Sequence, residues 1–348
     1  MKAETRPIQP SVYAFLFLFA LTAVASIALQ NFIWIAVALF LVHQFRHHLA
    51  FNWPRGIFAL ATLLFLASFF WASLIGVNPA KSFHTVHKYL VLTLIFWVGA
   101  TGLNRRQIQN LLLGILAGAS VCAVCGIFKY WDGLQDRITS FSGDKMVFGG
   151  LLMVCFLLEI FFIRIKRHIG WMAAALPVTA LALFFTQTRG AWVGSAAGFI
   201  LLMSRFNRKW IIAGALSGLL IFFILPRHFQ KRIESIAQIQ LSYDAQGHLS
   251  NANPDRIMIW ISGWRLIQDH PWGIGQGNLV DVYPHYKFPV MHDPTEPHLH
   301  NNFLQILAQN GWLGLALYLF WIFAFYRSAL GLKFSNPEDQ DLNWTLIC

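Results

Sequence analysis

Long apolar runs, each of about 17 to 20 residues, follow one another along most of this sequence with only short polar breaks between them. A helix of that length is what crosses the hydrocarbon core of a bilayer. Only 12% of the 348 residues are charged, against about 25% in soluble domains. The sequence therefore predicts an all-α protein that is a polytopic transmembrane helical bundle.

The runs and their breaks also define the expected domains. Residues 1–225 are expected to form a transmembrane bundle of about nine spans, 226–300 a large helical loop that carries site residues, and 301–348 one further span or more. Because Trp344 to Cys348 looks like the start of another apolar segment, we expect an incomplete C-terminus and ten or more spans. The expected spans lie near 11–29, 31–45, 56–75, 83–101, 108–128, 146–164, 169–186, 190–205, 209–225 and 301–326.

Lysine and arginine are distributed unevenly between the two sets of short loops, and this bias predicts the orientation. One set holds 14 of the 26 basic residues and is expected to face the cytoplasm, whereas the opposite set holds six. The net charge of +11 does not indicate nucleic-acid binding, because the basic residues are scattered between apolar runs. The 14 residues are Lys2, Arg6, Arg46, Arg55, Arg105, Arg106, Arg164, Lys166, Arg167, Arg205, Arg208, Lys209, Arg327 and Lys333.

With that orientation the 226–300 segment lies outside the cytoplasm. Periodic apolar residues around Ile233–Ile239 and Ile257–Ile267 predict two helices there, on or near the membrane surface. The Gly/Pro-rich stretch from Pro271 to Pro297 predicts irregular backbone. We therefore expect the reaction to take place on the side of the membrane away from the cytoplasm.

A first candidate for chemistry is the polar break from Thr186 to Trp192, which separates two apolar runs on the outer side. An arginine at membrane depth costs about 2.5–3.5 kcal/mol on insertion scales and usually faces a cavity or a partner. Arg189 is flanked by Thr188 and Gly190, which favours an arginine held in place as an anion ligand. The alternative is an arginine that snorkels from a helix end to the interface.

A second candidate is the stretch from Asp255 to Asn278. Arg256 and Arg265 are nine residues apart, so on a helix they point in opposite directions and one of them can face a site. Either can instead form a surface salt bridge with Asp255 or Asp269. The following Gly273, Gly275 and Gly277 mimic a phosphate loop only superficially, because no strand and no Gly-Lys-Ser/Thr accompany them. Nucleotide binding is therefore not expected.

A third candidate is the stretch from His292 to Leu304, which leads into the last expected span. Its three histidines and two carboxylates suit a metal ion, but two prolines stiffen it and it has neither a helical H-x-x-x-H pair nor a cysteine. The alternative is a single base at a helix start, where the positive end of the helix dipole disfavours imidazolium. His300 has that position, with Asn301 or Asn302 as the expected cap, although a histidine can also sit there merely as an interfacial residue.

These three segments together resemble the superfamily of O-antigen ligases and polymerases, which are glycosyltransferases of the bacterial envelope. The resemblance rests on the order and sidedness of the motifs, and it covers most of the chain. The matching pieces are Thr188-Arg189-Gly190, the block from Arg256 through Trp260 and Arg265 to His270-Pro271-Trp272-Gly273-Ile274-Gly275, His300-Asn301 with Phe303-Leu304-Gln305, and Asn310-Gly311-Trp312-Leu313-Gly314.

The resemblance implies an inverting enzyme without metal or other cofactor, multi-pass in the bacterial inner membrane, with its active site facing the periplasm. Its partners would be an undecaprenyl pyrophosphate-linked glycan donor, a lipid A-core acceptor and membrane lipids, with no nucleic acid and no nucleotide. By the same resemblance Arg189 and Arg265 bind the pyrophosphate and His300 acts on the acceptor hydroxyl. Arg265 is preferred to Arg256, which Asp255 could neutralise. The further candidates for contact with pyrophosphate or glycan are Arg256, His298, Trp264 and Asn301.

Other functions remain open at this point. An O-antigen polymerase or a protein O-oligosaccharyltransferase would share these motifs and differ in the acceptor. A secondary transporter would need inverted repeats and polar groups near the bilayer midplane, and neither is apparent in this sequence.

Overall fold

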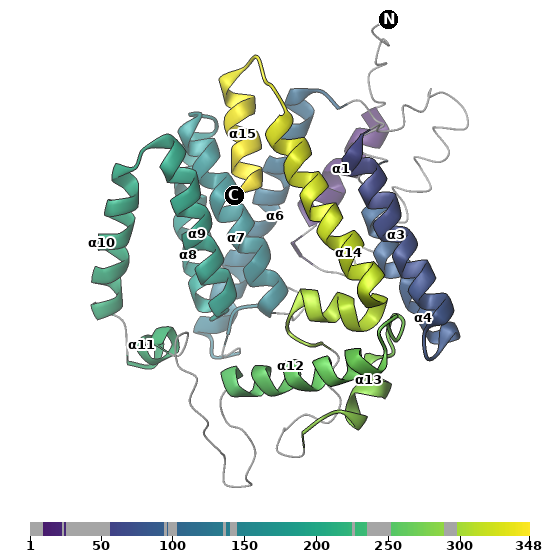
Figure 1. Ribbon diagram of the computed structural model, residues 1–348. Coiled ribbons are helices and arrows are strands. Elements are labelled where there is room, and N and C mark those ends of the chain that lie inside the picture. Colours follow the sequence, from purple (N-terminus) through teal and green to yellow (C-terminus); the bar gives the residue numbers. More distant parts are fainter. Residues whose placement is uncertain are drawn as a thin grey trace, which may run out of the picture. The chain divides into compact units, whose positions relative to one another are not determined.

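The computed structural model describes residues 10–22, 24–25, 56–93, 96, 103–134, 137–139, 145–224, 227–234, 252–288 and 298–348. Helices dominate this part of the chain, and no strand occurs in it (Figure 1). The chain divides into two compact units. Unit 1 comprises Met1–Asn52, Trp97–Ile236 and Lys333–Cys348, and unit 2 comprises Trp53–Phe96 and Ala237–Leu332. The expected all-α class is confirmed, and each unit is described by itself.

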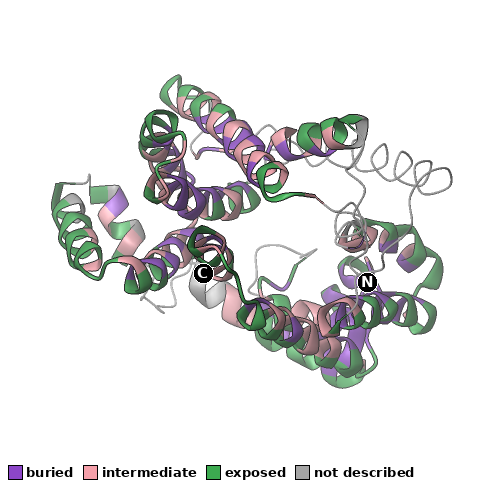
Figure 2. Ribbon diagram, turned by 90° about the horizontal axis from the view of Figure 1, so that it is seen from above, coloured by how far each residue is buried: buried purple, intermediate pink, exposed green. Residues whose placement is uncertain are grey.

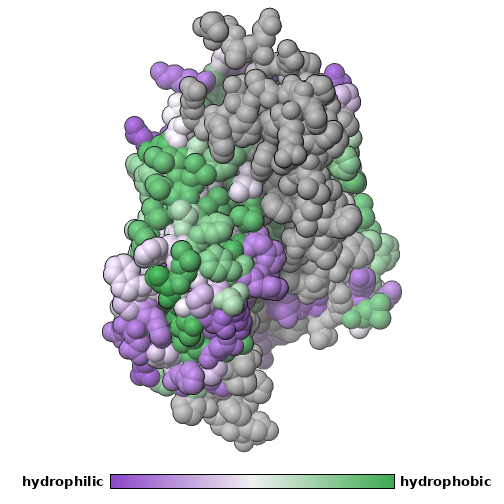
Figure 3. Space-filling view, turned by 90° about the vertical axis from the view of Figure 1, so that its right-hand side faces the viewer, coloured by the Kyte–Doolittle hydropathy of each residue, from purple (hydrophilic) through white to green (hydrophobic). Residues whose placement is uncertain are grey.

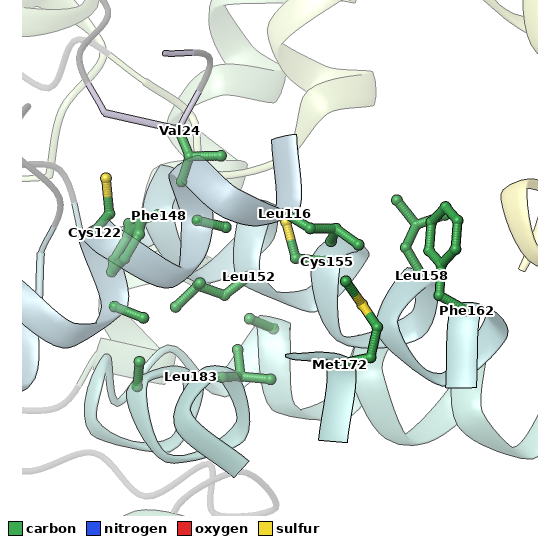
Figure 4. Packing of buried hydrophobic residues seen from close by; sticks show 14 of the residues in the cluster. Val24, Leu116, Cys122, Phe148, Leu152, Cys155, Leu158, Phe162, Met172 and Leu183 are labelled. Atoms are coloured by element: carbon green, nitrogen blue, oxygen red, sulfur yellow. The ribbon is translucent and has the colours of Figure 1, made fainter. Parts of the chain in front are cut away.

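Unit 1 is organised around three neighbouring helices, α6, α7 and α8, whose facing sides are mostly apolar and include a buried polar pair, Thr179 and Glu159. Leu116 of α6, Phe148 and Leu152 of α7 and Met172 of α8 are completely buried in one cluster (Figure 4). Such close packing without voids is the usual state of a protein interior. The helices of unit 1 are α1 (Pro10–Thr22), α6 (Arg105–Trp131), α7 (Lys145–Arg164), α8 (Ile169–Phe185), α9 (Arg189–Phe206), α10 (Lys209–Ile224), α11 (Arg227–Glu234) and α15 (Pro337–Ile347).

Unit 2 pairs two long helices, α3 and α14, and places a shorter helix, α12, across one end of them (Figure 1). Aromatic rings join the long pair: Phe65 of α3 lies 5.4 Å from Tyr318 and 5.9 Å from Trp321, centroid to centroid. Non-helical backbone at Gly311 breaks α14. The elements are α3 (Ile57–Ile75), α4 (Pro79–Val86), η1 (His87–Thr93), α12 (Ala252–Asp269), α13 (Leu279–Val282), η2 (Tyr283–His285) and α14 (Asn302–Gly331).

Four helices within the described part of the chain, α3, α6, α7 and α14, are long and apolar enough to cross a membrane. Shorter apolar helices cover the expected spans at 169–186 and 209–225. The expected span at 83–101 differs, because its described part is the end of α4 followed by the 3₁₀ helix η1. The expected span at 31–45 lies outside the described residues.

The outer faces of these helices agree with a lipid environment. Figure 2 shows exposed residues along the sides that helices turn away from their neighbours, and on α14 large apolar side chains such as Leu319 and Phe323 are about half exposed. The face drawn in Figure 3 carries a band of hydrophobic residues with hydrophilic residues gathered below it. Soluble proteins rarely expose continuous apolar surface of this kind, so these helices indicate a membrane protein.

Polar contacts in unit 1 gather at two opposite helix ends. At one end Arg105 pairs with Glu338 and Asp339, and Arg164 and Arg205 with Asp341. At the other end lie the start of α7 and the connection between α8 and α9. Arg105, Arg164 and Arg205, which we expect to face the cytoplasm, thus share one end of this unit, whereas the connection that carries Arg189 is at the other.

Candidate functional site

The turn between α8 and α9 presents Arg189 in unit 1. Helix α8 ends at Phe185, Gln187 adopts a left-handed conformation with φ 53°, and α9 starts at Arg189 after Thr188 as its N-cap residue. The Thr188 carbonyl accepts from the amides of the first turn of α9, at 3.0 and 3.2 Å. Arg189 is half-buried. The expected arginine in a short turn at a helix start is confirmed in position, whereas its role as a ligand stays a prediction.

A second arginine holds this turn. Arg137 Nε donates to the Thr186 carbonyl at 2.8 Å, and Arg137 Nη2 donates to Thr188 Oγ1 at 3.5 Å. The neighbouring Ile138 amide donates to the Phe185 carbonyl at 3.1 Å. These donors satisfy carbonyls at the end of α8 that have no partner within the helix.

Thr188 also joins the turn to α7, because its Oγ1 donates to the Lys145 carbonyl at 3.2 Å. The contact with α7 is close at Gly149, where a Cβ atom would meet Thr188 Cβ at 3.0 Å. Lys145, the first residue of α7, therefore lies beside the turn.

In unit 2, α12 carries the second group of predicted residues. Trp264 and Arg265 are exposed, and Arg256 is half-buried near the start of the helix. The Arg265 guanidinium lies over the Phe288 ring, 4.5 Å from its centroid. A cation over a ring face is worth about 0.5–1 kcal/mol at exposed sites and limits the directions the side chain takes. Helix α12 ends at Asp269, just before Pro271, as expected.

Helix α14 begins next to the third group. Asn301 is its N-cap, with Oδ1 accepting from the amides of Phe303 at 3.0 Å and Leu304 at 3.3 Å. His300 precedes the cap in a left-handed conformation with φ 49° and is exposed, as is His298. Of the two expected caps, Asn301 is therefore the correct one.

The structure brings the segments that carry Arg265 and His300 together within unit 2. Leu299 is completely buried, and a Cβ atom at Gly263 would lie 2.9 Å from Leu299 Cδ1. The chain before His300 is thus packed against α12 at the residue that precedes Trp264 and Arg265. The Leu299 amide also donates to Gln305 Oε1 at 2.8 Å, which ties this segment to the first turns of α14.

The glycine-rich loop after α12 has a structural role that the sequence did not reveal. The amides of Ile274 and Gly275 donate to the Ala308 and Gln309 carbonyls at 2.9 and 3.0 Å, and the Trp312 amide donates to the Pro271 carbonyl at 3.1 Å. These carbonyls become available because α14 breaks at Gly311, with φ 67°. The loop is therefore inserted into the break.

Buried amide side chains complete this junction. Gln276 Nε2 donates to Asn310 Oδ1 at 2.7 Å, and Asn310 Nδ2 donates to Ser68 Oγ of α3 at 3.3 Å. Asn278 Nδ2 donates to Ser82 Oγ of α4 at 3.0 Å. These bonds tie the loop to α14, α3 and α4, while Gln276 Oε1 and Asn278 Oδ1 are buried without a hydrogen-bond partner among the described residues.

Sequence reasoning missed Arg137 and the amide network, because their partners are distant in the chain. Asn310 and Gly311 were recognised only as parts of a motif. Among the described residues no group of three His, Cys, Asp or Glu side chains is arranged to hold a metal ion. Most of the histidine and carboxylate stretch, 289–297, lies outside the described residues.

Comparison with known proteins finds similarity to one family. Residues 172–319 match the family model described as O-antigen ligase. This confirms the resemblance to the O-antigen ligase superfamily. The chain is also 25% identical to a protein of Rickettsia prowazekii (strain Madrid E) described as a "Putative polysaccharide ligase", over 79% of this chain and 69% of that protein.

The part that matches the O-antigen ligase model runs from α8 to the middle of α14 and contains every predicted site residue. It includes the α8–α9 turn, α12, the glycine-rich loop and the capped start of α14. These matches support a glycosyltransferase-like enzyme with a polysaccharide or lipid-linked substrate.

Proposed function

We propose that this protein is an O-antigen ligase that transfers O-antigen polysaccharide from undecaprenyl pyrophosphate to a hydroxyl of the lipid A-core oligosaccharide, with inversion and without a metal ion. The observation that carries the proposal is the arrangement of residues at the start of α14 in unit 2. It holds His300 directly before a capped helix start, on a segment packed against the helix that bears Arg265. The matched residues, 172–319, include this arrangement.

The proposed reaction divides its work between arginines and a histidine. Arg189 and Arg265 bind pyrophosphate oxygens, since guanidinium groups offer paired donors to phosphate. The acceptor oxygen attacks the anomeric carbon, the bond from that carbon to the pyrophosphate oxygen breaks, and undecaprenyl pyrophosphate leaves with the bonding electrons. His300 takes the acceptor proton. Charge that develops on the leaving group is stabilised by the arginines.

Purified full-length variants separate these roles. His300→Ala should lower turnover about 10²–10⁴-fold, the usual contribution of general-base catalysis, with little change in donor affinity. Arg189→Lys keeps the charge but loses the planar fork, so donor affinity should fall about tenfold. Exposed residues of the same types, His285→Ala and Arg208→Lys, are the matched controls. Loss of donor binding by His300→Ala with turnover retained at saturating donor, or wild-type behaviour of Arg189→Lys, would overturn the assignments.

The same variants test the use of two arginines on one donor. If Arg189 and Arg265 bind the same pyrophosphate, the losses in donor affinity of Arg189→Lys and Arg265→Lys should not be additive in the double variant, because residues that share a partner couple energetically. Simple additivity would show that one of them contacts something else.

A gene deletion distinguishes ligase from polymerase. Loss of all O-antigen from the lipid A-core band on a lipopolysaccharide gel indicates the ligase, whereas retention of a single repeat unit indicates the polymerase. The ligase is favoured here by the description of the matching family and by that of the relative.

Orientation is part of the proposal, since the lipid-linked donor must meet its acceptor outside the cytoplasm. A cysteine placed at Gln246 should react with an impermeant thiol reagent added from the periplasmic side of the inner membrane, and one at Lys166 should not. Cysteines other than the introduced one are replaced for this experiment. Cytoplasmic labelling at Gln246 would contradict the proposed function.

A further inference from the structure

We propose that Arg137 is a positioning residue for Arg189, acting through the turn between α8 and α9. The inference rests on the proposed function, in which Arg189 binds pyrophosphate. Arg137 connects Thr186, the C-cap residue of α8, to Thr188, the N-cap residue of α9. Its guanidinium makes the two contacts with different nitrogen atoms, Nε and Nη2, in the fixed geometry of one planar group.

The segment that carries Arg137 is itself held firmly. Ile138 is completely buried, and its Cγ2 lies 2.5 Å from where a Cβ atom of Gly126 in α6 would be. A larger residue at position 126 would therefore displace this segment. Together with the bond from the Ile138 amide to Phe185, this contact fixes the Arg137 backbone between α6 and the end of α8.

The first turn of α9 has little freedom of its own. Trp192 Nε1 donates to the Leu183 carbonyl at 3.1 Å, and the Trp192 ring stacks on Phe184 with centroids 5.3 Å apart. The orientation of α9 relative to α8 therefore depends on the conformation of residues 186–188, in which Gln187 is left-handed. A non-glycine residue in that conformation costs about 1–3 kcal/mol and persists only where its surroundings impose it. Arg137 binds on both sides of Gln187 and so helps to impose it.

A capping role alone would require only the bond to the Thr186 carbonyl, because a cation near the end of α8 satisfies its free carbonyls. The second bond has another effect, because it is made to Thr188. Thr188 is the N-cap residue of α9, so its position sets the position of Arg189, the first residue of that helix. Rotation of the turn would move the Arg189 backbone without unfolding either helix. The expected consequence of losing Arg137 is therefore weaker donor binding and less stabilisation of the leaving pyrophosphate.

The test measures binding of undecaprenyl pyrophosphate to the full-length protein in detergent. Arg137→Lys keeps the charge but loses the planar guanidinium whose Nε and Nη2 make the two bonds, and Thr188→Val removes the accepting hydroxyl while Arg137 stays. Both should weaken pyrophosphate binding about tenfold, the usual loss for one hydrogen bond to a charged group. Thr188→Ser and the control Arg208→Lys should bind like the wild type. With glycan-linked donor, KM should rise and kcat at saturation should fall as it does in Arg189→Lys, since Arg189 also stabilises charge on the leaving group.

Double variants decide whether Arg137 acts through Arg189. In an Arg189→Lys background, Arg137→Lys and Thr188→Val should each weaken pyrophosphate binding by less than about twofold further, because the residue they position has already lost its fork. Multiplication of the single effects would overturn the inference. If Arg189→Lys alone leaves pyrophosphate binding unchanged, the proposed function of that arginine fails instead, and the two failures are thus distinguishable. Should Arg137→Lys not fold, the Thr188→Val pair gives the same decision.

Discussion

The two units present their predicted site residues in different ways. In unit 1 a short turn is held by side chains: Arg137, Thr186 and Thr188 make the contacts that precede Arg189. In unit 2 the helix that follows His300 is held through backbone further along, because amides of the glycine-rich loop bond to carbonyls at the break in α14. Side-chain bonds thus fix the start of α9 in unit 1, whereas close backbone contact fixes the break within α14 in unit 2.

The difference has energetic consequences. Each side-chain hydrogen bond contributes about 0.5–1.5 kcal/mol to the free energy of unfolding, and a single substitution can remove one bond and leave the others. A backbone junction that admits only glycine fails as a whole when a Cβ atom is added, since the neighbouring atoms are themselves backbone and cannot move away. Unit 2 should therefore respond more severely than unit 1 to single substitutions at the point of closest contact.

The largest expected effect is that of Gly311→Ala. Gly311 has φ 67° and ψ −171°, a region that is essentially restricted to glycine, and a Cβ atom there would lie 2.4 Å from the Trp272 carbonyl carbon. The free energy of unfolding should fall by about 3 kcal/mol, the upper range for such backbone strain. Thermal unfolding in detergent measures it. Gly331→Ala in the same helix, with no atom within 4 Å of the new Cβ, is the control and should not be destabilised.

A smaller loss is expected for Thr186→Val in the turn of unit 1. Thr186 is completely buried, its Oγ1 donates to the Leu183 carbonyl at 2.8 Å, and it accepts from the Thr188 amide at 3.2 Å. The isosteric valine leaves that buried amide without this acceptor, which costs about 1–3 kcal/mol. Thr22→Val, where the hydroxyl returns to the Leu18 and Phe19 carbonyls of its own helix, should cost less. Equal melting temperatures for the two variants would mean that the side chains do not hold the turn.

The sequence predicted those parts of the fold that depend on residues close together in the chain. Apolar runs predicted α6, α7 and α8 well, because length and hydropathy are local properties. The run at 83–101 did not predict the 3₁₀ helix η1, since apolar content reports burial in lipid or protein and not the continuity of a helix. The break at Gly311 was not predicted either, because a single glycine is also compatible with an unbroken span.

The candidate site shows the same limit. The start of α9 at Arg189 and the cap at Asn301 follow local rules for helix ends, and both were predicted. Arg137 was counted only as a basic residue of an outer loop, since its partner Thr186 is 49 positions away. The loop from Gly273 to Gly277 was recognised as unlike a nucleotide loop, yet its contact with α14 needed the fold to be seen.

An effect of about 1 kcal/mol is expected for Asn301→Ala, the usual cost of losing an N-cap side chain. The comparison variant is Asn336→Ala, which removes the corresponding cap of α15. Both should lower the melting temperature slightly, but only Asn301→Ala should lower kcat, by a few fold, because only that cap adjoins His300. Asn301→Ser keeps a capping oxygen and should restore kcat. If serine fails to restore it while the donor KM rises, Asn301 binds the glycan directly and is not acting as a cap.

The smallest expected effect is none at all, on treatment with EDTA. A metal ion bound by the stretch from His292 to His300 would be a third way to hold His300, besides side-chain bonds and backbone contact. The cap at Asn301 and the packing of Leu299 on Gly263 already hold the residues on either side of His300, and arginines supply the positive charge that a cation would bring to a pyrophosphate. Turnover should therefore be the same with EDTA as with EDTA already saturated with Zn²⁺ or Mg²⁺. If EDTA abolishes activity and added Zn²⁺ or Mg²⁺ restores it, His300 is a metal ligand, and the role of free base assigned to it is wrong.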